Sequence, residues 1–151
     1  MPAKKLKEFL DSQAVKYVQL THSVAYTSHE IAQSLHISGR KIAKTVIVFI
    51  DGKMAMAVLP ANRSVNFDHF AKAIGANKIE LATEGQFKGM FPDCELGAMP
   101  PFGNLYEMDV YVDEHLRDDE IFFNACSHSE LIEMSYPDFE RLVKPKVVKL
   151  T

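Results

Sequence analysis

Three short stretches of the chain carry residue types that could do chemistry. They read GRKIAKT over 39–45, GAMPPFG over 97–103 and NACSHSE over 124–130. In the first stretch, Lys44 stands where an apolar strand is expected to begin, and Arg40 and Lys41 lie just before it. A cation fixed at a sheet edge can hold a phosphate as a point charge. The alternative, which residue type alone favours, is a lysine whose stem covers apolar surface while its ammonium reaches water.

The loop over 97–103 combines opposite backbone tendencies. Its two glycines let the chain turn and let a ligand come close. Its two prolines fix φ and favour an extended backbone at Met99 and Pro100. We therefore expect a stiff loop, bent at both ends, that holds its backbone groups ready for a ligand. An ordinary connecting turn is the simpler interpretation, because most Gly/Pro clusters are turns.

The third stretch follows a predicted apolar strand and contains Cys126, Ser127 and His128. Small polar residues at the end of a strand often carry binding groups. A thiol hydrolase, with Cys126 as nucleophile and His128 as base, is a weaker hypothesis. Residues two apart on a strand point the same way, but an unactivated cysteine is usually inert.

Composition and missing motifs argue against several classes of protein. The net charge of −3 argues against nucleic-acid binding through overall charge, and two cysteines are too few for a disulfide framework or a four-thiolate metal site. The six histidines form no HxH or HExxH pair, and the chain has no GxGxxG, P-loop or GxSxG motif. We therefore expect neither a metal nor a cofactor.

The length of the chain and the length of its apolar runs limit the possible architectures. A chain of 151 residues is expected to form one domain, over residues 1–151. No apolar run approaches the roughly 20 residues that span a bilayer, and the N-terminus does not resemble a signal peptide. The sequence therefore predicts a soluble, cytoplasmic protein with no membrane partner.

Periodicity predicts interleaved helices and strands. The strongest signal is a hairpin of two apolar runs around Asp51-Gly52-Lys53, which should lie in the middle of a covered sheet. Phe87, Met90 and Phe91 are expected to face inward from a helix that Pro92 ends. The expected helices cover roughly 3–13, 28–37, 67–74, 84–91 and 136–143, and the expected strands 15–21, 45–50, 54–59, 78–81, 105–112, 121–125, 131–134 and 147–150. This order predicts an α+β domain with a central mixed, curved or barrel-like sheet flanked by helices.

The three stretches, in this order and spacing, resemble the YbaK/prolyl-tRNA synthetase editing-domain family. The matching features are Ile42-Ala43-Lys44-Thr45, the Gly97-x-x-x-Pro101-Phe102-Gly103 loop and the Ser127-His128 pair. The likeness extends from Thr21-His22 to the last helix. It implies a YbaK-like fold and a free-standing aminoacyl-tRNA deacylase. Such an enzyme would hydrolyse the ester between a wrong small amino acid and the 3′ end of a tRNA. Examples of the expected substrates are Ala, Cys, Ser or Thr on a proline tRNA.

The resemblance also implies roles for individual residues. Lys44 would contact the terminal phosphate or ribose, the backbone at Gly97 would receive the aminoacyl group, and His128 would line the amino-acid pocket. Catalysis would depend on positioning and on the neighbouring ribose hydroxyl. Further substrate contacts are expected from Arg40, Lys41, Ala98, Met99, Pro101, Phe102, Gly103 and Ser127.

Two positions depart from the family pattern. Related sequences commonly have glycine where this chain has Cys126, and Ser or Thr where it has Pro100. Proline removes a hydroxyl and an N–H, so it can donate no hydrogen bond to a substrate. The alternative function is a non-catalytic module that binds a tRNA acceptor end or an aminoacyl-tRNA synthetase.

Overall fold

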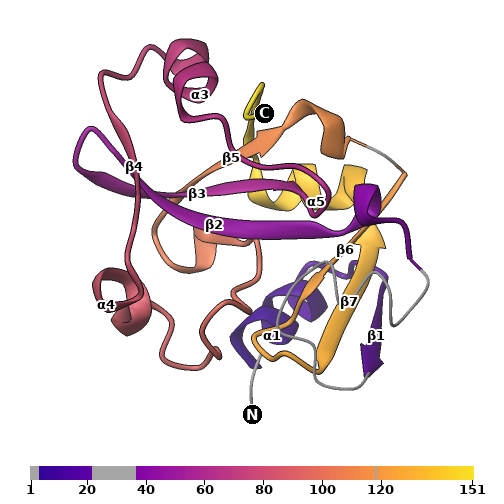
Figure 1. Ribbon diagram of the computed structural model, residues 1–151. Coiled ribbons are helices and arrows are strands. Elements are labelled where there is room, and N and C mark those ends of the chain that lie inside the picture. Colours follow the sequence, from indigo (N-terminus) through magenta and orange to yellow (C-terminus); the bar gives the residue numbers. More distant parts are fainter. Residues whose placement is uncertain (1–3, 22–36, 118) are drawn as a thin grey trace.

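The computed structural model describes residues 4–21, 37–117 and 119–151 (Figure 1). His22, His29 and His36 lie outside the described residues. So does the helix expected over 28–37, apart from its last residue. The described helices are α1 (Lys4–Ser12), α3 (Phe67–Ile74), α4 (Glu84–Phe87) and α5 (Tyr136–Val143). The described strands are β1 (Tyr17–Thr21), β2 (Ala43–Ile50), β3 (Lys53–Pro60), β4 (Ile79–Leu81), β5 (Asp109–Asp113), β6 (Glu120–Asn124), β7 (Glu130–Ser135) and β8 (Lys146–Val148).

The β2–β3 hairpin forms as predicted and is the longest pairing among the described strands. Asp51 and Gly52 make its turn with φ values of 48° and 86°, as a two-residue type I′ turn requires. Lys53, expected in the turn, is instead paired with Ile50 as the first residue of β3.

The hairpin belongs to a five-stranded mixed sheet in the order β4-β2-β3-β5-β8. β5 runs parallel to β3, and β8 runs parallel to β5. Phe70 of α3 packs on Tyr111 over one face of the sheet, and a larger apolar cluster that includes Ile47, Met56 and Val112 covers the other. Both faces are therefore covered, as the all-apolar strands predict.

A second sheet contains β1, β7 and β6, all antiparallel. A single bridge between Ile42 and Phe122 joins its edge to the start of β2. The expected curved sheet is thus built as two sheets that meet at one corner, with helices packed around them (Figure 1). The α+β class is confirmed.

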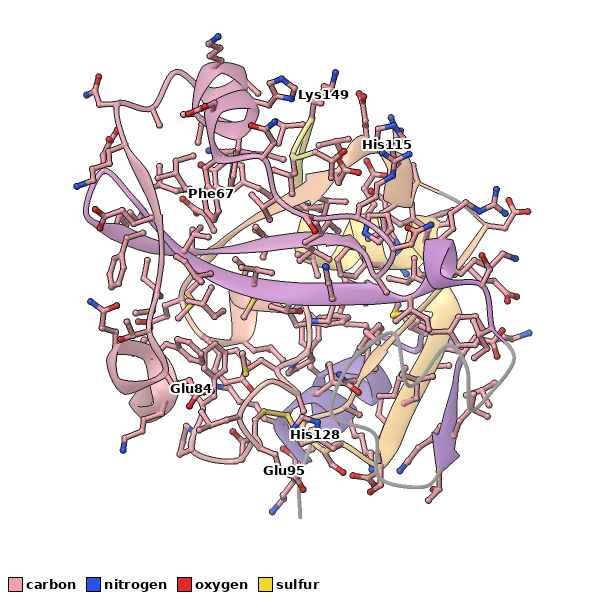
Figure 2. The ribbon with its side chains drawn as sticks, in the orientation of Figure 1. Phe67, Glu84, Glu95, His115, His128 and Lys149 are labelled. Carbon is pink, nitrogen blue, oxygen red and sulfur yellow. A yellow bond between two sulfur atoms is a disulfide. The ribbon has the colours of Figure 1, made fainter. Side chains whose placement is uncertain are left out.

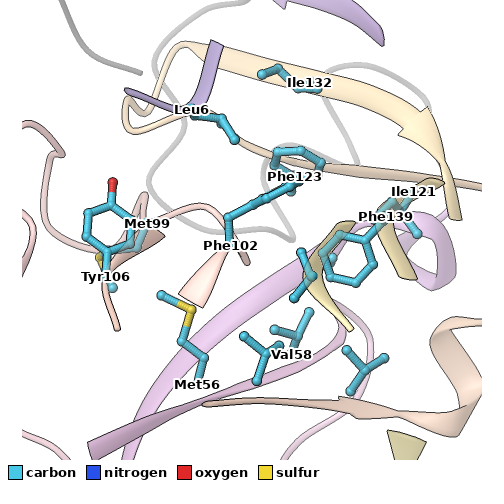
Figure 3. Packing of buried hydrophobic residues seen from close by; sticks show 14 of the residues in the cluster. Leu6, Met56, Val58, Met99, Phe102, Tyr106, Ile121, Phe123, Ile132 and Phe139 are labelled. Atoms are coloured by element: carbon cyan, nitrogen blue, oxygen red, sulfur yellow. The ribbon is translucent and has the colours of Figure 1, made fainter. Parts of the chain in front are cut away.

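The space between the sheets is filled by aromatic side chains. Phe102 lies at the centre, with its ring 6.2 Å from that of Phe9, 5.4 Å from that of Phe123 and 5.5 Å from that of Phe139 (Figure 3). These residues come from α1, β6, α5 and the loop after α4. The core therefore fixes the loop to the rest of the molecule.

Two expectations about local structure are wrong. Met90 is 44% exposed, because the chain changes from α4 to a 3-10 turn over Lys88–Met90 and rotates this side chain outward. The strand expected from residue 105 begins only at Asp109, since the chain makes a 3-10 turn over Gly103–Leu105 and Glu107 has a φ of 57°. Among the described helices, none is long and apolar enough to cross a membrane.

Candidate functional site

The loop over 97–103 is bent and held as its composition predicts, but its two glycines act differently. Gly97 is exposed and has a φ of 83°, a conformation that favours glycine. Gly103 is required by packing, because a Cβ there would lie 2.6 Å from Val110 Cγ2 and 2.7 Å from the Met108 carbonyl oxygen. The residues between the two glycines are buried.

The Phe102 side chain is part of the core. It is completely buried among the aromatic rings described above and anchors the loop, so a substrate contact is open only to the backbone of this residue. Ala98 and Met99 are also buried, and the Ala98 amide donates to the Glu95 carbonyl at 3.1 Å. In the described part of the chain, the amides of Gly97 and Met99 have no protein acceptor.

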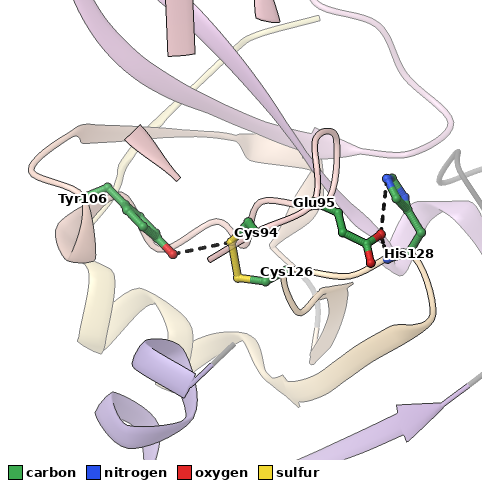
Figure 4. Close-up of a disulfide and its surroundings, with 5 residues drawn as sticks. All are labelled: Cys94, Glu95, Tyr106, Cys126 and His128. Carbon is green, nitrogen blue, oxygen red and sulfur yellow. Dashed lines mark hydrogen bonds and ion pairs between the residues drawn. A yellow bond between two sulfur atoms is a disulfide. The ribbon is translucent and has the colours of Figure 1, made fainter. Parts of the chain in front are cut away.

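The loop meets the turn that follows β6. The Cys126 amide donates to the Ala98 carbonyl at 2.9 Å, and the Glu95 amide donates to the Cys126 carbonyl at 2.8 Å. The His128 amide donates to the Glu95 carboxylate at 3.1 Å (Figure 4). Backbone and carboxylate hydrogen bonds therefore join two segments that are about thirty residues apart in the sequence.

The His128 imidazole is fixed against the loop. Its Nε2 lies 2.7 Å from the Leu96 carbonyl oxygen. A carbonyl only accepts hydrogen bonds, so Nε2 carries the proton and donates it. A Cβ built on Gly97 would lie 3.4 Å from His128 Cε1, so the ring lies directly against this glycine. The side chain is 8% exposed, so its position is determined by the protein.

The backbone of Cys126 adopts a left-handed conformation that favours glycine. Its φ is 66°, and its sulfur forms a disulfide with Cys94 (Figure 4). The expectation that Cys126 and His128 lie two apart on a strand is therefore wrong, because β6 ends at Asn124. The thiol-hydrolase hypothesis is also wrong for this structure, since a disulfide sulfur is not a thiolate nucleophile.

A cavity of about 210 Å³ connects the loop with the start of the β2–β3 hairpin. Gly97 and Met99 line it from the loop, and Thr45 lines it from β2. Its remaining walls are mainly apolar and come from Val46, Ile47, Leu81, Ala82, Glu84 and Phe87. A cavity with apolar walls and a few polar groups is the usual form of a small-ligand site. Thr45 was given no separate role from the sequence, because its place at this wall depends on the pairing of β2.

Lys44 adjoins the cavity residue Thr45 in sequence and is partly buried. Burial lowers the pKa of its ammonium below the ordinary 10.5. Among the described residues, no carboxylate forms an ion pair with Lys44. A partly buried cation of this kind is suited to an anion supplied from outside.

The other predicted site residues differ in how they are held. Arg40 and Lys41 lie in a 3-10 turn, Gly39–Lys41, just before β2. A hydrogen bond with Glu120 and burial raise the pKa of Glu133, and nearby Lys41 lowers it, so Lys41 lies toward the three-stranded sheet. The Ser127 hydroxyl lies 3.0 Å from the Ser129 hydroxyl and accepts from the Ser129 amide, so it stabilises its own turn.

Glu95 was not predicted from the sequence. Its carboxylate accepts from the His128 amide, and its oxygen lies 4.0 Å from His128 Nε2. Its position two residues before Gly97 was the only available signal. A larger cavity, of about 660 Å³, lies at β1 and β7 and contains none of the predicted site residues. Glu120, Glu133 and Asp138 line it together with Lys16, so its acidic side chains outnumber the basic one and disfavour a phosphate.

Known proteins resemble the chain in sequence and in fold. It is 24% identical over 98 residues to a proline–tRNA ligase of Bacillus mycoides, which is 65% of this chain and 17% of that protein. It is 29% identical over 92 residues to a proline–tRNA ligase of Leuconostoc citreum, which is 61% of this chain and 16% of that protein. The matched region therefore spans about a sixth of the length of these curated relatives.

Solved structures show the same fold at low sequence identity. The hypothetical protein APE2540 superposes with a TM-score of 0.87 at 19% identity, over 97% of this chain and 99% of that one. A protein described as a candidate trans-editing enzyme for prolyl tRNA synthetase superposes with a TM-score of 0.83 at 18% identity, over 99% of this chain and 96% of that one.

The family match covers most of the chain. The model of the aminoacyl-tRNA editing domain matches residues 22–142. These residues include Lys44, the loop over 97–103 and the turn that carries His128, so the three stretches singled out in the sequence all lie inside the match. The chain belongs to the aminoacyl-tRNA editing domain family.

Proposed function

We propose that the chain hydrolyses the ester of a tRNA mischarged with a small amino acid. The observation that carries this proposal is the packing of the His128 ring against Gly97, a residue that lines a small, mainly apolar cavity, inside the region that matches the editing-domain family. In this reaction water adds to the ester carbonyl, the bond to the ribose oxygen breaks, and that oxygen takes up a proton.

The site would act by positioning and by stabilising charge. The amides of Gly97 and Met99 are suited to hold the carbonyl oxygen, which becomes negative in the transition state. Lys44 would hold the phosphate or ribose of the terminal nucleotide. His128, held by Leu96 and Glu95, would form part of the wall around the acyl group and help to place water. The ribose hydroxyl next to the ester lies close enough in the substrate to assist.

The size of the cavity favours a small amino acid such as Ala, Cys, Ser or Thr. A synthetase pocket separates side chains that differ by one methylene by only about 1–3 kcal/mol, so a second site that admits small groups is needed for accuracy. The curated relatives are proline–tRNA ligases, which supports a proline tRNA as the carrier and a synthetase as a partner. The proposal thus includes a proline tRNA as the substrate and an aminoacyl-tRNA synthetase as the partner.

The test is a panel of tRNAs charged with alanine, serine, threonine, cysteine and proline, each followed for release of the amino acid. We expect hydrolysis of at least one small amino acid and none of correctly charged prolyl-tRNA. Lys44→Ala should lower kcat/KM by at least about a hundredfold, the size expected for loss of one positioned charge. Lys149→Ala is the matched control, because Lys149 is exposed and lies on the other side of the molecule from His128 (Figure 2).

The outcomes separate two functions. Undiminished hydrolysis by Lys44→Ala would show that the role proposed for Lys44 is wrong. Failure to hydrolyse any ester, together with measurable binding of tRNA or of a prolyl-tRNA synthetase, would favour the non-catalytic binding module instead.

A further inference from the structure

The edge of β2 that faces the cavity is open over a short stretch. β3 pairs with the whole of β2 on one side. On the other side, β6 meets the chain at Ile42 through the bridge to Phe122, and β4 pairs with it over Val48–Ile50. Between these two partners, no described strand covers β2, and Thr45 lies in the middle of this gap.

Thr45 turns its main-chain polar groups toward the gap. The Ala82 amide donates to the Ile47 carbonyl at 2.9 Å, so the Ile47 carbonyl faces the β4 side. In an antiparallel strand, the amide and carbonyl of alternate residues face the same side. The Thr45 amide and carbonyl therefore face the gap, and no described residue hydrogen-bonds to either.

The Thr45 hydroxyl adds a third polar group. Its Oγ1 is buried and has no hydrogen-bond partner among the described residues. Buried polar groups in proteins are nearly always hydrogen-bonded, so a buried group without a partner at a cavity wall requires an explanation. A ligand that completes the hydrogen bonds is one such explanation.

The residues on the two walls of the cavity have opposite hydrogen-bonding groups. In the described part of the chain, the amides of Gly97 and Met99, which donate, have no protein acceptor, and the carbonyl and hydroxyl of Thr45, which accept, have no protein donor. Glu84 lines the same cavity and adds negative charge. An ester carbonyl needs donors and an ammonium needs acceptors. An α-aminoacyl ester carries both groups on neighbouring carbons.

We propose that Thr45 binds the α-ammonium of the aminoacyl group through its carbonyl and its hydroxyl. The substrate class is then esters of α-amino acids with a free amino group, and esters that lack this group are excluded. This inference rests on the proposed hydrolase function and names the part of the substrate that the β2 wall recognises.

The test compares alanyl-tRNA with lactyl-tRNA, made from it by deamination with nitrous acid. The two esters differ only in an ammonium against a hydroxyl of similar size. Because the ammonium also makes the ester more reactive, each enzymatic kcat/KM is divided by the uncatalysed rate of the same ester. We expect alanyl-tRNA to be preferred by at least about tenfold after this correction, the effect of losing a hydrogen bond to a charged group.

Variants of Thr45 assign the preference to this residue. Thr45→Val keeps the shape and removes the hydroxyl, so it should reduce the preference mainly by raising KM for alanyl-tRNA, with little effect on lactyl-tRNA. Thr45→Ser keeps the hydroxyl and should restore the preference, which a purely structural role of the methyl group would not predict.

Each outcome has one meaning. Equal corrected rates for the two esters would overturn the assignment of the α-ammonium and leave the hydrolase function standing. An equal loss for both esters in Thr45→Val would overturn the role of Thr45 in amine recognition. If neither alanyl-tRNA nor any other ester of the panel is hydrolysed, the proposed function fails and the assignment fails with it.

Discussion

Gly97 and Gly103 are required for different physical reasons, and this difference can be tested. Gly97→Ala puts a side chain on a residue with a φ of 83° and places a Cβ 3.4 Å from His128 Cε1. We expect a loss of about 1 kcal/mol in the free energy of unfolding and at least about a tenfold loss in kcat/KM, because the strained residue carries a proposed substrate-binding amide. Urea denaturation and deacylation kinetics measure the two effects.

Gly103→Ala provides the comparison within the same loop. Its Cβ would overlap Val110 Cγ2 and the Met108 carbonyl oxygen, so we expect a larger loss of stability, about 1–3 kcal/mol. The folded fraction should keep more of its activity than Gly97→Ala does. Full activity in Gly97→Ala would contradict the role given to Gly97.

Lys44 should make stability depend on pH in the alkaline range. Burial lowers the pKa of its ammonium, so the folded protein releases this proton at a lower pH than the unfolded chain does. Between the two pKa values the unfolded chain binds more protons, and stability therefore rises with pH. Lys44→Met keeps the stem and removes the charge, so it should be more stable than the parent at about pH 7.

Urea denaturation over a series of pH values tests this effect. The difference in unfolding free energy between Lys44→Met and the parent should shrink as the pH approaches the ordinary lysine value of 10.5. Lys149→Met, on the exposed surface, should show no such trend. A constant difference across the pH series would mean that burial does not penalise the Lys44 ammonium.

At the scale of the elements, the disulfide fixes the loop to the turn that carries His128. Cys94 and Cys126 are 32 residues apart, and closing a loop of this length stabilises a protein by roughly 3–4 kcal/mol in the chain-entropy model. We expect a reducing agent, or Cys94→Ser, to lower the free energy of unfolding by about this amount. Identical denaturation curves with and without reductant would show that the bond does not form in solution.

Substitutions of Cys126 separate the bond from the backbone conformation. Cys126→Ser and Cys126→Gly both remove the disulfide, but the φ of 66° strains serine and suits glycine. Cys126→Gly should therefore be more stable than Cys126→Ser by about 0.5–1 kcal/mol. Equal stabilities would mean that this φ imposes no penalty on a side chain.

Most helices, strands and turns could be predicted from local signals in the sequence. How these elements pair and contact one another could not. The Asp51-Gly52 turn is predictable from sequence, because it depends on neighbouring residues. The same holds for the starts of α3 and α4, where the Asn66 side chain accepts from the His69 amide and the Gln86 side chain accepts from the Thr83 amide. The gap in the β2 edge was not predictable, since it depends on where the short strand β4 and the bridge from β6 end. Thr45 shows the consequence, because its sequence motif was recognised and its place at the cavity wall was not.

The site shows the same division between local and long-range information. The bends of the loop and its approach to His128 followed from composition and from the family resemblance. The carboxylate of Glu95 and the bond between Cys94 and Cys126 require two loops to meet, and the sequence does not specify their distance. Phe102 was assigned to substrate, but its ring is used by the core, because loop composition does not show which side of a loop faces inward.

At the scale of the whole molecule, the buried carboxylate of Asp113 and the candidate site lie on different sides of the β2–β3 hairpin (Figure 2). Asp113 is completely buried at the end of β5, and one carboxylate oxygen accepts from the Leu150 amide at 3.0 Å. The other oxygen lies 3.0 Å from His115 Nδ1. The Leu150 carbonyl accepts from the Asn66 amide at 2.7 Å, so this carboxylate connects the C-terminal segment with β5 and α3.

Asp113→Ala should therefore destabilise the protein without altering the site. It leaves the buried Leu150 amide without its acceptor, and we expect a loss of at least about 2 kcal/mol in the free energy of unfolding. Figure 2 shows His115, which neighbours Asp113, on the side of the hairpin away from His128, so kcat/KM measured well below the melting transition should stay within about twofold of the parent. Asp109→Asn is the control on the same strand. It breaks only the exposed ion pair with Lys53, which is worth about 0–1 kcal/mol. A large loss of kcat/KM in fully folded Asp113→Ala would show that the C-terminal segment and the site are coupled through the sheet.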